Sequence, residues 1–303
     1  MTTEAETETI REWQAMPAAR PWVLTFLGRL RHHPLGMLGL IGVIMFLTLA
    51  VFGHWIAPHS PTAQSSALHQ APSLSHPFGT DMLGRDILSR VIGATPIELR
   101  VGLVSVFVGV ALATVVGLVS GYLGGAIDSA IQRVVDSWLA FPQLVLLLII
   151  TSVLGASART LTIALVIGSI APTSRIIRGT VLAEKNNTFI EAARVIGASQ
   201  LRIMLRHILP QIVAPIIVII SIMIPLISLL GAALSFLGLG LPPPQPSWGA
   251  DVSGDSLTYF RNFPWMAIFP GAALSLYVLS FNLLGDAMRD IFDPRLRGSG
   301  SMH

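Results

Sequence analysis

Six apolar runs, each long enough to cross a bilayer as a helix, constrain the fold of this chain more than any other feature. The hydrocarbon core of a bilayer is about 30 Å thick, and an α-helix crosses it in about 20 residues. Hydrophobic residues make up 52% of the 303 residues and charged residues only 12%, about half the share found in soluble domains. Because lipid cannot satisfy unpaired backbone groups, each run is expected to be helical. We therefore predict an all-α integral membrane protein with six transmembrane helices, at 35–56, 101–123, 134–154, 161–181, 212–234 and 265–284.

The positively charged residues are distributed unevenly between these runs. If the N-terminus is cytoplasmic, the inner segments contain fourteen Arg and Lys residues and the outer segments four. Because positive charge favours the cytoplasmic side, both termini and residues 182–211 are expected inside, and residues 58–96 and 240–262 outside. The inner set is Arg11, Arg20, Arg29, Arg31, Arg133, Arg175, Arg178, Lys185, Arg194, Arg202, Arg206, Arg289, Arg295 and Arg297, and the outer set is Arg85, Arg90, Arg159 and Arg261.

Small residues and prolines indicate how the helices pack. Gly117, Gly121 and Gly125 repeat at four-residue spacing, which predicts a smooth face for close approach by another helix of the same chain. A pore-lining face is the alternative interpretation. Pro215 and Pro225 in the fifth run are expected to bend it, because each removes an N–H donor and crowds the preceding turn.

The sequence lacks the motifs of an ATPase, a serine hydrolase, a zinc protease and a cysteine-dependent site. The chain has no Cys, no GxxxxGK[ST] phosphate loop, no GxSxG elbow and no HExxH pair. The ionisable residues in or beside the runs are expected near helix ends, where solvation is the default, so no relay of buried carboxylates or histidines is expected. They are Glu98, Arg100, Asp128, Asp136 and Asp286. A chain of this kind that moves solute uphill must take energy from a partner.

The stretch EAARVIGASQLRIMLRHILP, residues 191–210, interrupts the apolar sequence with charge. Thr188 and Glu191 fit a capping box, and Gly197 suits a helix C-terminus. Ser199 can cap a second helix running to His207. As a continuous helix the segment would place its polar residues on one side, opposite Ile196 and Ile203. Such a helix could rest on the inner lipid surface, with its arginines against anionic headgroups. The polar residues are Glu191, Arg194, Ser199, Arg202 and Arg206.

The spacing of this stretch supports a second interpretation. EAA, three residues, Gly197, nine residues and then HILP resembles the EAA loop of ABC importer permeases, the cytoplasmic element that docks in a groove of the ATP-hydrolysing subunit. The resemblance implies that Ala192 and Ala193 present a small surface to that groove. The residues carried over for ATPase coupling are Glu191, Ala192, Ala193, Arg194, Gly197, Ala198, Arg202, His207 and Pro210.

Three further stretches resemble the dipeptide, oligopeptide and nickel branch of these permeases, and specifically its C-type subunit. They are HPFGTDMLGRDILSR at 76–90, LSFLGLGLPPPQPSWG at 234–249 and FNLLGDAMRDIFDPRL at 281–296. With the EAA stretch they bracket roughly residues 22–297, and Ala287, where the branch commonly has Gly, is a minor departure. The outer-loop residues that the resemblance singles out are Gly79, Asp81, Gly84, Arg85, Asp86 and Arg90.

The outer stretches also have structural interpretations. Thr80 can cap an amphipathic helix on the membrane surface, in which Asp81 pairs with Arg85 and Asp86 with Arg90 at i,i+4 spacing. That helix would serve as scaffolding, and contact with a docking protein is the alternative. The prolines at 242–246 are expected to end the fifth run, and Trp248 to lie at the membrane interface.

The resemblance implies a type I ABC importer permease fold and four divisions of the chain. They are a cytoplasmic tail and lead-in at 1–34, a first helix and outer loop at 35–96, a core of five helices at 97–290 with the coupling loop at 182–211, and a cytoplasmic tail at 291–303. The expected location is the bacterial inner membrane. A self-sufficient secondary transporter or channel is the alternative.

The resemblance also implies a set of partners. They are a second homologous permease, two ABC ATPase subunits that carry the ATP and Mg²⁺, an extracytoplasmic solute-binding protein and membrane lipid, with no nucleic acid. The chain itself is expected to hold no cofactor or metal and to catalyse no reaction. The solute would be a di- or oligopeptide, glutathione, an opine or a nickel chelate.

The topology can be tested with single cysteines, because the chain has none of its own. An impermeant thiol reagent added to intact cells should label Ser66→Cys and leave Lys185→Cys unlabelled until the membrane is opened. The reverse pattern would invert the orientation assigned from the positive charges.

Overall fold

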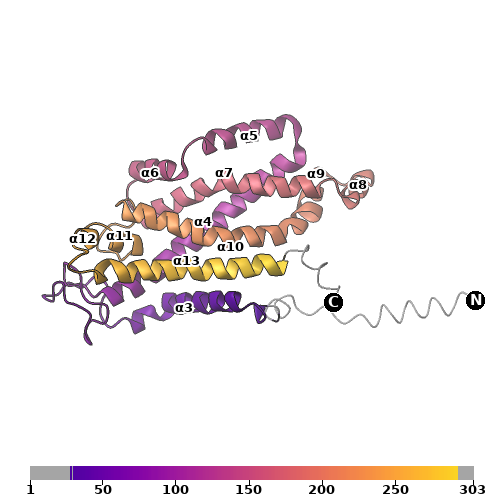
Figure 1. Cartoon of the computed structure of the whole chain (residues 1–303). Helices are drawn as coiled ribbons and strands as arrows, with labels where there is room; N and C mark the ends of the chain where they lie inside the picture. Colours follow the sequence, from indigo (N-terminus) through magenta and orange to yellow (C-terminus); the bar gives the residue numbers. More distant parts are fainter. Residues whose placement is uncertain (1–27, 29, 293–303) are drawn as a thin grey trace, which may run out of the picture.

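Five long helices form the body of the protein. The computed structural model describes residues 28 and 30–292, and these contain helices and loops but no β-sheet. Each long helix has the length and hydropathy to cross a membrane, which confirms the all-helical prediction, and a bent pair of helices offers a sixth crossing. The five are α3 (Pro34–Ile56), α4 (Ile87–Leu123), α7 (Ala158–Glu184), α10 (Leu209–Phe236) and α13 (Trp265–Phe292) (Figure 1).

The third predicted run is not one helix. Residues 134–154 are divided between α5 (Gly125–Leu139) and α6 (Gln143–Leu154), whose axes differ by 83°. Pro142 explains the break, because proline lacks an N–H donor and disfavours helical backbone at the residue before it. Its own backbone is extended, with φ −56° and ψ 126°. The prediction of an uninterrupted helix at 134–154 was therefore wrong.

Helix α4 is longer than its apolar run. It begins at Ile87, fourteen residues before the predicted start at 101, so the division expected between residues 96 and 97 falls inside the helix. Its interface with α7 is the most extensive in the molecule. A Cβ atom at Gly117 would lie 2.7 Å from the Ser174 carbonyl oxygen, and one at Gly121 would lie 2.9 Å from the Val181 side chain. The expected packing role of Gly117 and Gly121 within the chain is confirmed, whereas Gly125 belongs to α5 and has no such neighbour.

Helix α5 packs against α7 and is joined to it by two ion pairs. Arg178 donates to Asp128 through Nε at 2.7 Å and through Nη2 at 2.5 Å. Arg175 pairs with Asp136. Both pairs use arginines near the end of α7 that continues into the coupling segment.

An aromatic cluster joins three elements of the bundle. Phe46 of α3, Trp248 of α11 (Trp248–Val252) and Tyr277 of α13 have ring centres 5.3–5.7 Å apart. Trp248 is fully buried inside the protein, and its depth at the membrane interface stays a prediction. Helix α3 approaches α13 closely because Gly39 has no side chain, and a Cβ there would lie 2.5 Å from the Leu284 nitrogen.

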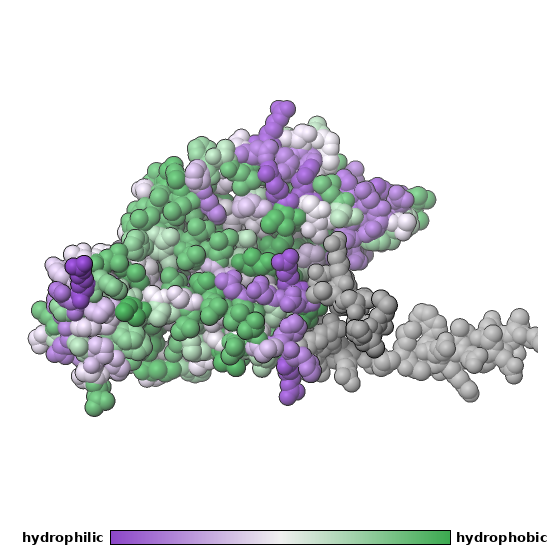
Figure 2. All heavy atoms as spheres, viewed as in Figure 1, coloured by the Kyte–Doolittle hydropathy of each residue, from purple (hydrophilic) through white to green (hydrophobic). Residues whose placement is uncertain are grey.

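The outer and inner segments lie at opposite ends of the bundle. Figure 1 places residues 57–86, α11 and α12 (Asp255–Thr258) at one end, and α8 (Thr188–Val195) with α9 (Gln200–Ile203) at the other. In Figure 2 hydrophobic side chains cover the middle of the visible face. This separation is what the predicted topology requires, although the side of the membrane stays a prediction. Asn186 is exposed, whereas Lys185 donates to the Gly121 carbonyl at 3.0 Å, so Asn186→Cys is the better inner probe.

Some predictions lie outside the described residues. These are the tails at 1–27 and 293–303, which include Arg11, Arg20, Arg295 and Arg297, and the single residue Arg29.

The α4–α7 contact yields a test with a matched control. Gly117→Ala should lower stability by about 1–3 kcal/mol, because its Cβ would meet the backbone of α7. Gly179→Ala makes the same change on α7 where no atom lies within 4 Å, and should leave stability unchanged or slightly raised. Thermal unfolding in detergent measures both, and equal midpoints for the two variants would contradict the close contact.

Candidate functional site

The coupling segment begins with a short helix whose cap differs from the prediction. Helix α8 starts at Thr188, and the capping residue is Asn187, which makes no side-chain cap. Asn187 instead donates to Glu184 Oε2 at 2.7 Å, while its carbonyl accepts from the Glu191 N–H at 3.3 Å. The predicted capping box of Thr188 and Glu191 was therefore wrong. The box requires Thr188 to be the capping residue, whereas the capping residue is Asn187, one position earlier.

The turn at Gly197 is as predicted. Gly197 has φ +79°, the left-handed conformation that glycine adopts without strain. Its N–H donates to the Arg194 carbonyl at 3.0 Å, and the Ala198 N–H donates to the Ala193 carbonyl at 3.0 Å. These two bonds form a Schellman motif that closes the C-terminus of α8.

The second helix of the segment does not end at His207. Ser199 caps it as predicted, with its Oγ accepting from the Arg202 N–H at 3.4 Å. Helix α9 then continues through a π-helical turn, η1 (Met204–Ile208), into α10, so that residues 200–236 form one helix. The wider π turn comes just before Pro210, where an ordinary α turn would bring the proline ring against the preceding carbonyl. The segment is thus continuous with a long helix of the bundle.

The segment is anchored on one side and exposed on the other. Ile190, Ala193 and Ile203 are buried in the main core, whereas Val195 and Ile196 are 86% and 83% exposed. Ala193 therefore cannot present a surface to a partner, which leaves Ala192 alone of the predicted pair. Ile196 and Ile203 do not share one face as predicted, because the turn at Gly197 separates them. Figure 1 shows α8 beyond the end of α7, at one end of the part of the chain that the structure describes.

The charged residues of the segment surround this apolar tip. Glu191, Arg202 and Arg206 are exposed, and within the described chain none of them forms an ion pair. The Arg194 guanidinium lies 5.6 Å from the centre of the Tyr122 ring, which attaches α8 to the end of α4. His207 is half-buried, Pro210 exposed and Ala198 half-buried.

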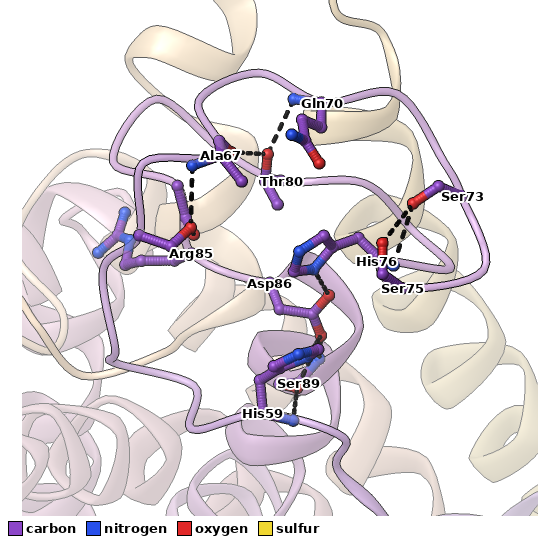
Figure 3. Close-up of polar contacts among 12 residues, drawn as sticks. His59, Ala67, Gln70, Ser73, Ser75, His76, Thr80, Arg85, Asp86 and Ser89 are labelled. Atoms are coloured by element: carbon purple, nitrogen blue, oxygen red, sulfur yellow. Dashed lines mark hydrogen bonds and ion pairs between the residues drawn. The ribbon is translucent and has the colours of Figure 1, made fainter.

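The outer motif is a tight loop rather than the predicted surface helix (Figure 3). Thr80 does not cap a helix, since its hydroxyl donates to the Ala67 carbonyl and accepts from the Gln70 N–H. Asp81 pairs with Arg85 at 2.6 Å as predicted, but within a turn bounded by Gly79 and Gly84, which have φ +77° and +69°.

Asp86 and Arg90 do not pair with each other. The Asp86 carboxylate caps α4 by accepting from the Ser89 N–H at 2.8 Å. Arg90 is buried and reaches Asp251 of α11, with Nη2 2.5 Å from Oδ1. The predicted Asp86–Arg90 pair was wrong because Asp86 lies just before the helix and is used by its N-terminus.

A network of buried polar groups then joins α11 to α4. Ser247 Oγ donates to Glu98 at 2.9 Å, and Trp248 Nε1 donates to the Val91 carbonyl at 3.0 Å. Glu98 is buried rather than solvated near a helix end as predicted. Sequence reasoning did not single out Asp251, and it assigned Glu98 to a solvated helix end. Glu98 lies directly beside the apolar run at 101–123. Because charged residues are rare in lipid, a carboxylate in that position indicates a buried polar contact.

The charge of the buried Asp251 carboxylate is stabilised by Arg90. Burial raises the pKa of Asp251 above its usual value, while Arg90 acts in the opposite direction. The second oxygen, Oδ2, is buried with no hydrogen-bond partner among the described residues. Loss of Arg90 would therefore leave a buried and uncompensated charge.

We expect Arg90→Met to cost about 3–5 kcal/mol at neutral pH. The variant should regain stability as pH falls, because the folded protein would hold the Asp251 proton more tightly than the unfolded chain does. Thermal unfolding across pH measures this, with Arg261→Met as an exposed control. Arg90→Met with Asp251→Leu should be less destabilised than Arg90→Met alone, and an equal loss would contradict the ion-pair explanation.

Comparisons with known proteins cover nearly the whole chain. A family model described as a binding-protein-dependent transport system inner membrane component matches residues 113–298, and one described as the N-terminal TM domain of oligopeptide transport permease C matches residues 21–75. The chain is 42% identical over 291 residues to the glutathione transport system permease protein GsiD of Escherichia coli O6:K15:H31 (strain 536 / UPEC) and to that of Shigella boydii serotype 4 (strain Sb227). These alignments cover 94% of this chain and 96% of each relative.

Proposed function

Because the chain belongs to the family of binding-protein-dependent transport system inner membrane components, in the peptide and nickel branch of ABC importer permeases, we propose that it forms half of an ATP-driven import pathway. A second homologous permease would supply the other half. An extracytoplasmic binding protein would deliver the solute, and the complex would lie in the bacterial inner membrane. The 42% identity to a relative over nearly its full length supports this assignment.

The solute is proposed to be a short peptide or a peptide-like molecule such as glutathione. The relatives are named for glutathione transport, and the family match includes an oligopeptide permease domain. A cleft of about 640 Å³ lined by α7, α10 and α13 carries both apolar and polar side chains near the coupling segment, which would suit a zwitterionic solute. Its polar lining residues are Thr180, Glu184, Gln211 and Arg289.

The exposed tip of the coupling segment supports docking to an ATPase. Val195 and Ile196 project from a short helix whose other side is fixed in the core, and such exposed apolar side chains are typical of a binding surface. The arginines around the tip would add long-range attraction to an acidic partner. We propose that two ABC ATPase subunits bind ATP and Mg²⁺ and that this chain catalyses nothing itself, in keeping with the absence of a phosphate loop.

Movement of the docked segment would reach the membrane through α10. Because residues 200–236 form one helix, displacing its inner end moves the span as a body. The cation–π contact of Arg194 with Tyr122 links the same segment to α4. We infer that these two connections carry closure of the ATPases to the pathway.

A self-sufficient secondary transporter is the weaker proposal. Among the described residues, the buried charged side chains lie near the outer ends of the helices and do not continue through the bundle. A proton-coupled carrier needs ionisable groups along its path. The fully buried charged residues are Asp81, Asp86, Arg90 and Glu98, and Asp251, the partner of Arg90, is largely buried.

Gly197 offers the sharpest test of coupling. Nothing lies within 4 Å of a Cβ at this position, so a substitution acts through backbone conformation alone. Gly197→Val should abolish solute-stimulated ATPase activity of the reconstituted complex, because a left-handed backbone costs a side-chain-bearing residue about 1–2 kcal/mol and a β-branched one more. Gly197→Asn, which tolerates this conformation, should retain most activity.

Ile196→Asp separates docking from lipid contact. It should release the ATPase during co-purification while leaving the spans inserted, whereas Arg202→Ala should have a smaller effect. The opposite result would be a loss of solute-stimulated ATPase activity in Arg202→Ala but not in Gly197→Val or Ile196→Asp. That result would mean that the segment rests on anionic lipid instead of docking to the ATPase. The purified chain alone, as a control, should hydrolyse no ATP.

A further inference from the structure

Two histidines and an aspartate converge in the outer loop, apart from the coupling segment and the cleft. His59 follows α3, His76 opens the outer motif, and Asp86 caps α4 (Figure 3). One ligand atom from each lies within 4.8 Å of those of the other two. His76 Nδ1 is 3.0 Å from Asp86 Oδ1, and His59 Nδ1 is 3.9 Å from Asp86 Oδ2. We propose that these three side chains bind a divalent transition-metal ion of the Zn²⁺ class.

The donor set suits such an ion. Two neutral imidazoles and one carboxylate are ligands for Zn²⁺ and its neighbours, whereas Mg²⁺ and Ca²⁺ require oxygen donors. With Zn–N bonds of about 2.0–2.1 Å and a tetrahedral angle, two imidazoles on one ion have ring centres about 5 Å apart. The His59 and His76 ring centres are 4.8 Å apart. Small movements of the side chains would therefore bring both nitrogens onto one ion.

The backbone that carries the three residues is already held in place. The His59 N–H donates to Ser89 Oγ at 3.0 Å, which fixes it beside the start of α4. The His76 carbonyl accepts from the Ser73 N–H at 2.9 Å and from the Gly79 N–H at 2.8 Å. Asp86 is held by a β-bridge to Thr80 and by its own capping bonds. A site on a fixed backbone loses little conformational freedom when the ion binds.

Besides these side-chain movements, binding needs Nδ1 of His76 to give up its proton. In the metal-free arrangement His76 Nδ1 carries a proton and donates to Asp86 Oδ1, because a carboxylate oxygen only accepts. As a metal ligand the His76 ring carries a proton on Nε2 alone. The lone pair of His76 Nδ1 and the Asp86 Oδ1 atom then both face the ion. Asp86 Oδ2 continues to accept from the Ser89 N–H and hydroxyl, at 2.8 and 2.7 Å, so the helix cap survives and orients the ligand.

The site is open toward water on one side. The His59 side chain is 44% exposed, His76 14% and Asp86 1%. The ion would enter from the outer solution and keep a position for water, because three protein ligands leave a tetrahedral ion one ligand short. It would tie the beginning of the 57–86 loop to its end and so stiffen the outer face of the protein.

The test uses the full-length chain without a histidine tag, in lipid nanodiscs, after removal of metal with a chelator. Titration with Zn²⁺ against a chromophoric competitor should show a single tight site per chain. His59→Ala and His76→Ala should each lower the Zn²⁺ affinity by at least about 100-fold. Mutating a residue that only hydrogen-bonds to a metal ligand already lowers metal affinity by about 10–100-fold. His54→Ala is the matched control, because it removes another exposed outer histidine five residues away and should leave the affinity unchanged.

Two further measurements guard against a folding defect. Zn²⁺ should raise the midpoint of thermal unfolding of the wild type and of His54→Ala but not of His59→Ala. Co²⁺ should give the intense visible absorption of a tetrahedral site only in chains that keep both histidines. His59 makes no side-chain hydrogen bond within the described chain, so His59→Ala should fold even if His76→Ala does not. Equal Zn²⁺ affinity for the wild type and His59→Ala would overturn the proposal and leave His76 as a hydrogen-bond donor to the helix cap.

Discussion

The close contact between α4 and α7 is the constraint on which the rest of the structure depends. Without a hydrophobic driving force between helices in lipid, association relies on close packing, and Gly117 and Gly121 allow the backbone of α7 to approach. Both functional ends are attached to this pair. Helix α8 follows α7 and is fixed to the end of α4 through Tyr122, while α11 docks on the outer part of α4. A shift in this contact would move both ends together.

The polar interactions are distributed in a way that fits an energy-coupled permease. The buried charges gather at the end of the bundle opposite the coupling segment, where Arg90 and Asp251 hold α11 in place and Glu98 accepts from Ser247. They stabilise a cap over the helices rather than forming a path through them. At the inner end the charged side chains remain exposed around an apolar tip. One end is therefore held by buried polar contacts, whereas the other exposes its charged and apolar side chains.

The helix formed by residues 200–236 connects these two kinds of surface. It begins at the Ser199 cap, passes through a π-helical turn before Pro210 and continues across Pro215 and Pro225 to the outer side. A helix transmits displacement along its axis because each turn is hydrogen-bonded to the next. The π turn is the local adjustment that lets a proline motif lie within a continuous helix instead of ending it.

The sequence by itself determined the features that depend on local chemistry: the membrane class, the spans other than 134–154, the left-handed turn at Gly197 and the Ser199 cap. These follow from hydropathy, from the unique freedom of glycine and from short-range hydrogen bonds. Only the tertiary structure decided which groups meet across long separations. Glu98 with Ser247, Arg90 with Asp251 and the burial of Ala193 depend on how helices pack, which no local pattern records. The same holds for the 83° bend at Pro142, since proline predicts a break but its angle is set by the neighbours of α5 and α6.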